Sequence, residues 1–165
     1  MIAYTPAPPN ATPVVLLPLT GKDVGTIASW RYPRPYHGYD IDGPQMLRDI
    51  LNRDNHFMAL TINDGLMGFC IYGPDGRVPG YDYDESAVDI GIGIRPDLTG
   101  KGNGTIYVGA VVTAVVTACA GRPLRVTIAS WNRRSTKVWM ANRFVASDSF
   151  VTTDGRPFDI LIRPA

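Results

Sequence analysis

The sequence predicts a single-domain α/β protein built on a mixed sheet. The first observation is its length, because 165 residues are enough for one domain with its own hydrophobic core. The second is the alternation of short apolar runs with longer helical segments, in the order β-α-α-β-β-β-α-β-α-β-β. The third is that no repeat, low-complexity tract or interdomain linker divides the chain. Residues 1–165 are therefore expected to form one domain.

The first elements are marked by composition and by a helix start. Residues 1–13 (MIAYTPAPPNATP) are rich in proline and small residues, which predicts a flexible N-terminal extension. The run VVLLPL (14–19) predicts a strand. Thr20 and Asp23 have the spacing of a capping box, so a helix is expected from there to about Trp30.

Prolines and a tight turn organise the next part of the chain. The stretch WRYPRPYHGYDIDGP (30–44) carries three prolines and is expected to be a loop. Pro44 suits the first turn of a second helix, which ends near Arg53. The runs FMALTI (57–62) and LMGFCIY (66–72) flank an Asn-Asp-Gly turn, which predicts a β-hairpin.

Strands and helices alternate in the C-terminal half. The expected elements are an irregular segment at 73–85, a strand at 87–94, a glycine loop, a helix at 104–120, a strand at 124–130, a helix at 133–143 and two strands around a turn at 153–155. Glycine and proline at 121–123 end the first of these helices.

Composition excludes several classes of function. The formal net charge of +1 gives no electrostatic case for binding nucleic acid. Two histidines, without an HExxH or CxxC pattern, do not predict a metal site. Cys70 and Cys119 lie far apart in apolar stretches and are expected to be buried, reduced thiols. The longest apolar run, Ile106 to Ala120, is too short to span a membrane, and no signal sequence is recognisable, so a cytoplasmic protein is expected.

The segment RPDLTGKGNG (95–104) places three glycines at alternate positions between a strand and a helix. The P-loop pattern fails because Arg95 stands where a glycine is required, and the dinucleotide pattern GxGxxG fails at Thr105. Closely spaced glycines before a helix can still point backbone N–H groups at an anion, with Lys101 and Arg95 adding charge. A tight turn without any ligand explains the loop alone equally well.

The preceding strand has an unusual face. Asp89, Gly91 and Gly93 lie on one side and isoleucines on the other. Glycines weaken a strand unless something approaches closely. Either a ligand chain or a closely packed helix would explain them.

These residues resemble the GCN5-related N-acetyltransferase superfamily, and more narrowly a bacterial subgroup whose acceptors are uncharacterised. Ile94-Arg95-Pro96 matches the family's V-x-P segment. Residues 99–104 resemble its [Q/R]-x-x-G-x-[G/A] motif, with Thr99 at the Gln/Arg position. The stretch LRVTIASWNRRSTKVWMANRF resembles its second strand–helix motif, with Asn132 at the Asn position and Ser135 at the small-residue position.

The resemblance implies a mostly antiparallel sheet flanked by helices, with a splayed central strand pair. It implies transfer of an acetyl group from acetyl-CoA to a primary amine of a small molecule or peptide, without a metal. The backbone N–H near Ile92 suits the oxyanion. The implied cofactor-binding residues are Ile92, Ile94, Thr99, Gly100, Lys101, Gly102, Asn103, Gly104, Asn132, Ser135 and Trp139.

The catalytic residues are less well marked than the cofactor loop. Asp89 is the first candidate for the base and Glu85 the second, while Ser135 is a candidate partner for the leaving thiol. The family's usual tyrosine, a proton donor, is replaced by Trp139, and the usual glycine before Phe144 is Arg143. Two alternative functions therefore remain: a coenzyme A sensor that has lost catalysis, and a transferase that moves an acyl group longer than acetyl.

Acceptor recognition is assigned to the aromatic loop after the first helix. Its candidate residues are Trp30, Tyr32, Tyr36 and Tyr39. Packing of these rings on the core is the alternative. No membrane or nucleic-acid partner is expected, and a homodimer is left open.

Overall fold

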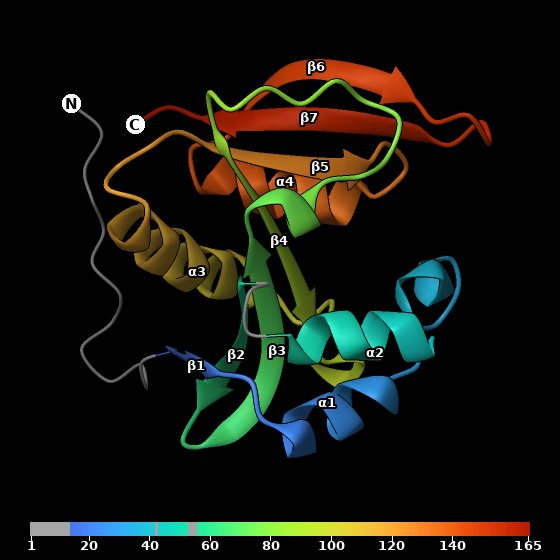
Figure 1. The fold of residues 1–165 in the computed structure, drawn as a ribbon, viewed down its shortest axis with the longest axis vertical. Coiled ribbons are helices and arrows are strands. Elements are labelled where there is room, and N and C mark those ends of the chain that lie inside the picture. The colour runs from blue at the N-terminus through green and yellow to red at the C-terminus, as the bar shows by residue number, and fades with distance from the viewer. Residues whose placement is uncertain (1–13, 42, 53–55) are drawn as a thin grey trace.

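A seven-stranded sheet forms the frame of the molecule (Figure 1). The computed structural model describes residues 14–41, 43–52 and 56–165, so the extension predicted for residues 1–13 lies outside the described residues. The strands are β1 (Val15–Pro18), β2 (His56–Ile62), β3 (Gly65–Tyr72), β4 (Val88–Ile94), β5 (Leu124–Ala129), β6 (Val145–Val151) and β7 (Pro157–Arg163).

The strand order is β1-β2-β3-β4-β5-β7-β6. Every neighbouring pair is antiparallel except β4 and β5, which are parallel. The predicted α/β class, with a mixed and mostly antiparallel sheet, is confirmed.

Helices cover both faces of this sheet. The α-helices of the described part are α1 (Gly21–Ala28), α2 (Pro44–Leu51), α3 (Gly104–Ala118) and α4 (Arg133–Ala141). In Figure 1, α3 and α4 pack on one face of the sheet and α1 and α2 on the other. Short 3₁₀ helices at Tyr36–Tyr39, Pro74–Gly76 and Pro96–Leu98 lie within segments that were predicted as loops.

Local sequence signals start the first two helices where they were expected. The Asp23 amide donates to Thr20 Oγ1 at 3.2 Å, and the Thr20 amide donates to Asp23 Oδ2 at 2.8 Å, which completes the capping box of α1. Pro44 occupies the first turn of α2, where its missing N–H leaves no helical hydrogen bond unmade.

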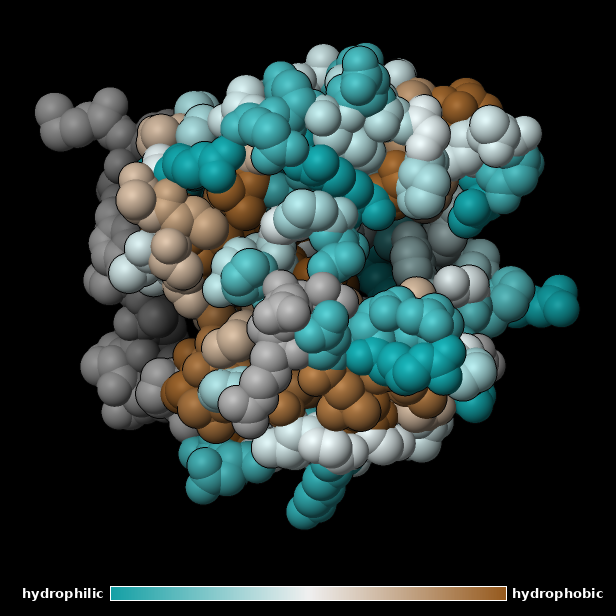
Figure 2. Space-filling view, viewed as in Figure 1, coloured by the Kyte–Doolittle hydropathy of each residue, from teal (hydrophilic) through white to brown (hydrophobic). Residues whose placement is uncertain are grey.

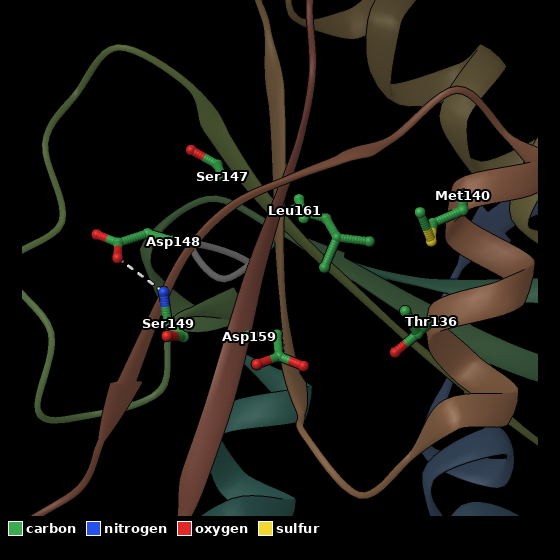
Figure 3. Close-up of a pocket in the computed structure, with 8 residues that line it drawn as sticks. Thr136, Met140, Ser147, Asp148, Ser149, Asp159 and Leu161 are labelled. Atoms are coloured by element: carbon green, nitrogen blue, oxygen red, sulfur yellow. Dashed lines mark hydrogen bonds between the residues drawn. The ribbon is translucent and has the colours of Figure 1, made fainter.

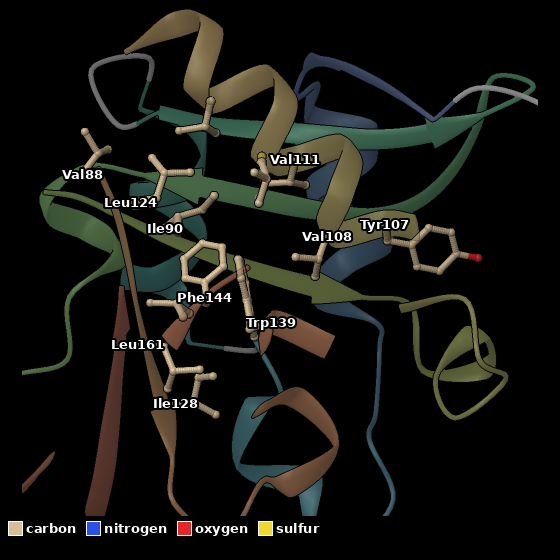
Figure 4. Close-up of a cluster of buried hydrophobic side chains, with 14 of the residues drawn as sticks. Val88, Ile90, Tyr107, Val108, Val111, Leu124, Ile128, Trp139, Phe144 and Leu161 are labelled. Atoms are coloured by element: carbon tan, nitrogen blue, oxygen red, sulfur yellow. The ribbon is translucent and has the colours of Figure 1, made fainter. Parts of the chain in front are cut away.

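The core lies between the sheet and the α3–α4 layer (Figure 4). The Trp139 ring from α4 meets Phe144 edge-on, with ring centroids 4.9 Å apart, and both are almost completely buried. Burial raises the pKa of the Cys70 thiol to about 12, so this cysteine is an unreactive part of the core. Cys70 and Cys119 are both free thiols.

The central strands β4 and β5 diverge along their length. They pair only at Val88–Leu124 and Asp89–Arg125, although β4 continues to Ile94 and β5 to Ala129. Figure 2 shows the surface hollowed between α2 and the C-terminal half of the sheet, on the side toward which the two strands open. The predicted splayed pair is confirmed.

The described residues contain neither a membrane-spanning helix nor a cluster of metal-binding side chains. None of their helices combines the length and the apolar character needed to cross a bilayer. No three or more of their histidine, cysteine and acidic side chains group closely enough to hold a metal ion.

Candidate functional site

The edge of β4 that faces β5 is open beyond the splay. The Arg95 amide donates to Met67 O, and Asp89 O accepts from Gly73, so odd-numbered residues of β4 direct their backbone groups toward β3. Even-numbered residues face the other way. Because pairing with β5 ends at Asp89, the N–H and C=O of Ile92 face the opening without a partner strand. This edge can receive an extended ligand chain.

The glycine loop lies at the end of this open edge. Gly100 and Gly102 have φ angles of +73° and +82°, the left-handed region that side-chain-bearing residues avoid. Within the described chain, the backbone N–H groups of residues 100–105 donate to no acceptor. Asn103, the N-cap of α3, provides no side-chain hydrogen bond to this helix end. A row of free donors at a helix N-terminus fits an anion such as a diphosphate.

Arg134 of α4 adds a positive charge beside this loop, which the sequence did not single out. A Cβ placed on Gly100 would meet Arg134 Nη1 at 3.4 Å. The Arg134 guanidinium stacks over the Tyr36 ring, 4.1 Å from its centroid. Arg95, in contrast, is neutralised by Asp97, with N–O distances of 2.7 and 3.1 Å. Among the described residues Arg134 therefore has no acidic partner, whereas Arg95 has one.

The first turn of α4 forms the opposite side of the opening. Asn132 caps this helix, since its Oδ1 accepts from the Ser135 amide at 3.1 Å. Its Nδ2 donates to the Tyr39 hydroxyl at 3.1 Å. Asn132 is buried and Ser135 is half-buried, and the Ser135 hydroxyl has no partner within the described residues.

The loop between α1 and α2 spans the mouth of the opening. The Tyr32 hydroxyl donates to Ile94 O at 2.7 Å, at the end of β4. Tyr39 reaches the other side at Asn132. Burial, aided by the nearby Asp40 carboxylate, raises the pKa of Tyr32 to about 12, and burial also raises the pKa of Tyr39.

Aromatic rings line this mouth. Tyr36 and Tyr39 both contact the ring of Trp131, with centroid distances of 5.3 and 5.9 Å. Trp30 behaves differently, because it is only 7% exposed and stacks on Phe69. The structure thus brings three of the four predicted acceptor residues to the mouth and places Trp30 in the core.

Comparison with known proteins adds structural neighbours. No protein-family model matches the chain, and no curated protein matches it in sequence. The structure of AAC(6')-Ib with paromomycin and acetyl-CoA has a TM-score of 0.72 at 17% identity, covering 92% of this chain and 93% of that one. A GNAT-family acetyltransferase from Bacillus anthracis has a TM-score of 0.71 at 12% identity, over 93% and 95%. PseH of Campylobacter jejuni with acetyl coenzyme A has a TM-score of 0.63 at 14% identity, over 92% and 98%.

The chain has the GCN5-related N-acetyltransferase fold. Within this fold the two motifs matched from the sequence converge, because Gly100 of the first lies against Arg134 of the second. The GCN5-related fold thus places residues 99–104 and the first turn of α4 on the same side of the molecule, where β4 and β5 open.

Asp89 does not have the surroundings of a base. It is 2% exposed, and its carboxylate accepts from Arg125 Nε at 2.6 Å, from Arg125 Nη2 at 2.9 Å and from Arg77 Nε at 2.7 Å. The hydrogen bonds to Asp89 also raise the pKa of Arg125. Both oxygens are occupied by cations, which argues against the prediction that Asp89 takes a proton from the acceptor. Asp89 is part of a buried ion-pair network.

Glu85 lies outside the opening as well. Its side chain is 78% exposed and pairs with Arg77 at 2.8 Å. It precedes the start of β4, whereas the glycine loop follows the end of that strand. The structure therefore brings neither predicted carboxylate to Ile92.

The glycines of β4 make room for side chains of β3. A Cβ on Gly93 would lie 2.3 Å from Phe69 Cε1, and one on Gly91 would lie 3.2 Å from Ile71 Cγ2. The close neighbour expected from the sequence is thus the adjacent strand, and neither a helix nor a ligand is needed to explain these residues.

Trp139 also lies elsewhere than the sequence predicts. The sequence placed it in the cofactor groove, but at 2% exposure it belongs to the core beside Phe144. It cannot contact a ligand in the opening without unfolding that part of the core.

A second hollow lies between α4 and the β6–β7 hairpin (Figure 3). This pocket, of about 460 Å³, is lined by Thr136, Met140, Ala146, Ser147, Asp148, Ser149, Asp159 and Leu161. Its two acidic residues are already hydrogen-bonded, Asp148 by Tyr81 and Asp159 by Ser130, each at 2.7 Å. The pocket shares no residue with the opening between β4 and β5.

Proposed function

We propose that the protein is an acetyl-CoA-dependent N-acetyltransferase. One observation carries the proposal: the unpartnered amides of residues 100–105 continue into the unpaired edge of β4 at Ile92. An extended ligand with a diphosphate at one end and an acyl thioester at the other matches this arrangement. Coenzyme A thioesters have that shape and charge.

The diphosphate would bind the amides of the loop, with Thr99, Lys101 and Arg134 around it. Left-handed glycines keep this part of the loop free of side chains, so phosphate oxygens can approach the backbone.

The pantetheine arm would follow the open edge of β4. Ile94 O is engaged by Tyr32, whereas both the N–H and the C=O of Ile92 lie on the open edge. The Ile92 N–H is then the donor available to the thioester oxygen as negative charge develops on it. Asn132 and Ser135 form the facing wall.

The acceptor would be a primary amine of a small molecule or peptide that enters past Tyr32, Tyr36 and Tyr39. AAC(6')-Ib, which shares the fold, was solved with paromomycin and acetyl-CoA, which supports an amine-bearing acceptor. With Asp89 held by two arginines, the amine proton would leave through water. We place the reaction in the cytoplasm and keep a homodimer as a prediction.

A coenzyme A sensor is the second candidate. It is favoured by Trp139, which stands where the family's proton-donating tyrosine is usual, and by the commitment of Asp89 to ion pairs, which removes the first candidate for the base.

The test measures binding and turnover separately. Calorimetry should show that acetyl-CoA binds, and release of the coenzyme thiol should follow with some member of a panel of polyamines, aminoglycosides and N-terminal peptides. Binding without thiol release on any amine would establish the sensor. Absence of binding would reject both.

A further inference from the structure

The hydrogen bond between Asn132 and Tyr39 has a fixed direction. Asn132 Oδ1 accepts from the Ser135 amide, so the side-chain amide is oriented with Nδ2 toward Tyr39. An NH₂ group can only donate, and the Tyr39 oxygen is therefore the acceptor. The Tyr39 O–H proton is left without an acceptor within the described residues.

The other hydroxyls at the mouth differ from Tyr39. Tyr32 uses its proton in the bond to Ile94 O. Tyr36 contacts Trp131 and Arg134 through its ring, but no polar group of the described chain fixes its hydroxyl. The Ser135 hydroxyl is an alcohol and a far weaker acid than a phenol, whose pKa is ordinarily about 10. Among these hydroxyls, only that of Tyr39 combines an anchored oxygen with a phenolic proton that has no acceptor in the described part of the chain.

Tyr39 is also placed where a ligand passes. It is 42% exposed, and it lies at the end of the 3₁₀ helix at Tyr36–Tyr39, within hydrogen-bond distance of Asn132 at the start of α4. Its partner Asn132 is the first residue of the wall that faces the open edge of β4.

We propose that Tyr39 is the acid that protonates the sulfur of coenzyme A as it leaves, an inference that rests on the proposed function. The amine nitrogen forms a bond to the acyl carbon, and the electron pair of the carbon–sulfur bond goes to sulfur. The Tyr39 O–H gives its proton to that sulfur, and the amine's surplus proton passes to water, from which the phenolate is reprotonated. Asn132 is the positioning residue, because it holds the oxygen while leaving the proton free.

The first experiment measures the ionisation of coenzyme A bound to the full chain, by the ultraviolet absorbance of its thiolate during a pH titration. A hydroxyl that donates to sulfur stabilises the thiolate, so the bound thiol should ionise about tenfold less readily in Tyr39→Phe than in wild type. Tyr81→Phe is the matched control, because its hydroxyl bonds to Asp148, away from the opening. An unchanged titration in Tyr39→Phe, or the same shift in Tyr81→Phe, overturns the proposal.

A coupled variant tests the role of Asn132. In Asn132→Asp the carboxylate still accepts from the Ser135 amide, but it also accepts the Tyr39 proton. The effect of Asn132→Asp on thiol ionisation should be smaller in a Tyr39→Phe background than in wild type. Equal effects in both backgrounds would show that Tyr39 donates nothing to sulfur.

Thiol release to hydroxylamine, a nucleophile that is neutral at pH 7, supplies the kinetic test. Tyr39→Phe should lower kcat at least tenfold with little change in the KM for acetyl-CoA, and the loss should shrink with a selenoester analogue, whose leaving group needs no proton. A larger loss in Tyr36→Phe or Ser135→Ala than in Tyr39→Phe assigns the proton elsewhere. Failure of wild type to release thiol, despite binding coenzyme A, would refute the transferase function itself, whereas full activity of Tyr39→Phe refutes only the role of Tyr39.

Discussion

Replacing Asp89 by Asn should destabilise the protein rather than disable its chemistry directly. The carboxylate neutralises two guanidiniums, and the Arg125 side chain is only 4% exposed. An amide of the same size leaves no cavity, but it carries no charge and its NH₂ group would point a donor at an arginine donor. Arg125 would keep a buried positive charge, with the exposed Asp84 as its remaining acidic partner.

The magnitude follows from this geometry. Removing one partner of a buried ion pair costs about 3–5 kcal/mol, because the other charge stays buried without compensation. For a chain of this size each 1 kcal/mol lowers Tm by about 2–4 °C, so Tm should fall by roughly 6–20 °C. The segment between β3 and β4 should loosen at the same time, since the guanidinium carbons of Arg77 and Arg125 lie 5.5 and 4.9 Å from the centroid of the Tyr83 ring.

Thermal unfolding followed by circular dichroism measures the loss, and calorimetry well below the lowered Tm measures coenzyme affinity on the folded fraction. Asp154→Asn is the control, because it breaks an exposed pair with Arg156 and should leave Tm nearly unchanged. If Asp89→Asn keeps the wild-type Tm yet loses turnover, the structural role assigned to Asp89 is wrong. Such a result would support the earlier hypothesis that Asp89 is the catalytic base.

Three further substitutions test the loop and the end of α4. Gly102→Val should weaken coenzyme A binding at least tenfold by calorimetry, because φ is +82° and a side chain there would shield the amides; unchanged affinity would remove the anion site from this loop. Arg134→Gln should weaken binding at low salt, with a smaller difference from wild type at about 1 M salt, where the Debye length is near 3 Å; a salt-independent loss would mean that Arg134 acts by packing. Arg143→Gly should raise Tm by about 2–4 °C, since Arg143 holds a φ of +70° at a cost of about 1 kcal/mol, and a lower Tm would show that its side chain outweighs the strain.

Signals confined to a few neighbouring residues predicted most of the fold. The capping box at Thr20, the proline at the start of α2 and the turn between β2 and β3 act within four residues, so each could be recognised without tertiary information. The 3₁₀ helix at Tyr36–Tyr39 was missed because the flanking prolines indicate only that the chain turns.

The role of the β4 glycines could not be predicted, because it depends on register across two strands. Gly93 faces Phe69, which is far away in the sequence, and only the pairing of β3 with β4 brings that ring over the glycine. A pattern along one strand shows that a residue lacks a side chain, but not which neighbour fills the space.

The helical periodicity of α4 predicted which residues share a face of the helix, but not how deeply each of them is buried. Asn132, Ser135 and Trp139 lie on one side of the helix, as their spacing requires, and the first two reach the opening. Trp139 is one turn further along, where the helix already packs against the core, so the same face that is accessible at its start is buried there. Asn132 and Ser135 thus lie near the opening, whereas Trp139 lies behind it in the core.

The hydrogen bond from Tyr32, in the α1–α2 loop, to β4 should stabilise the fold equally at all pH values up to about 10. Its hydroxyl donates to Ile94 O only while protonated, and burial raises its pKa from 10.0 to about 12. A group whose pKa is higher in the folded than in the unfolded state stabilises fully below the unfolded value, and that contribution is lost as pH rises through the folded value. The difference in unfolding free energy between wild type and Tyr32→Phe should therefore stay constant up to about pH 10 and fall between about pH 10 and 12, by at most about 2 kcal/mol because Tyr32 is partly exposed. Urea unfolding of both proteins at a series of pH values measures this difference, in which the titration of lysines common to both cancels. A difference that stays constant through pH 12 would mean that Tyr32 ionises in the folded protein as an exposed phenol does, and that the loop is not held to β4 by this bond.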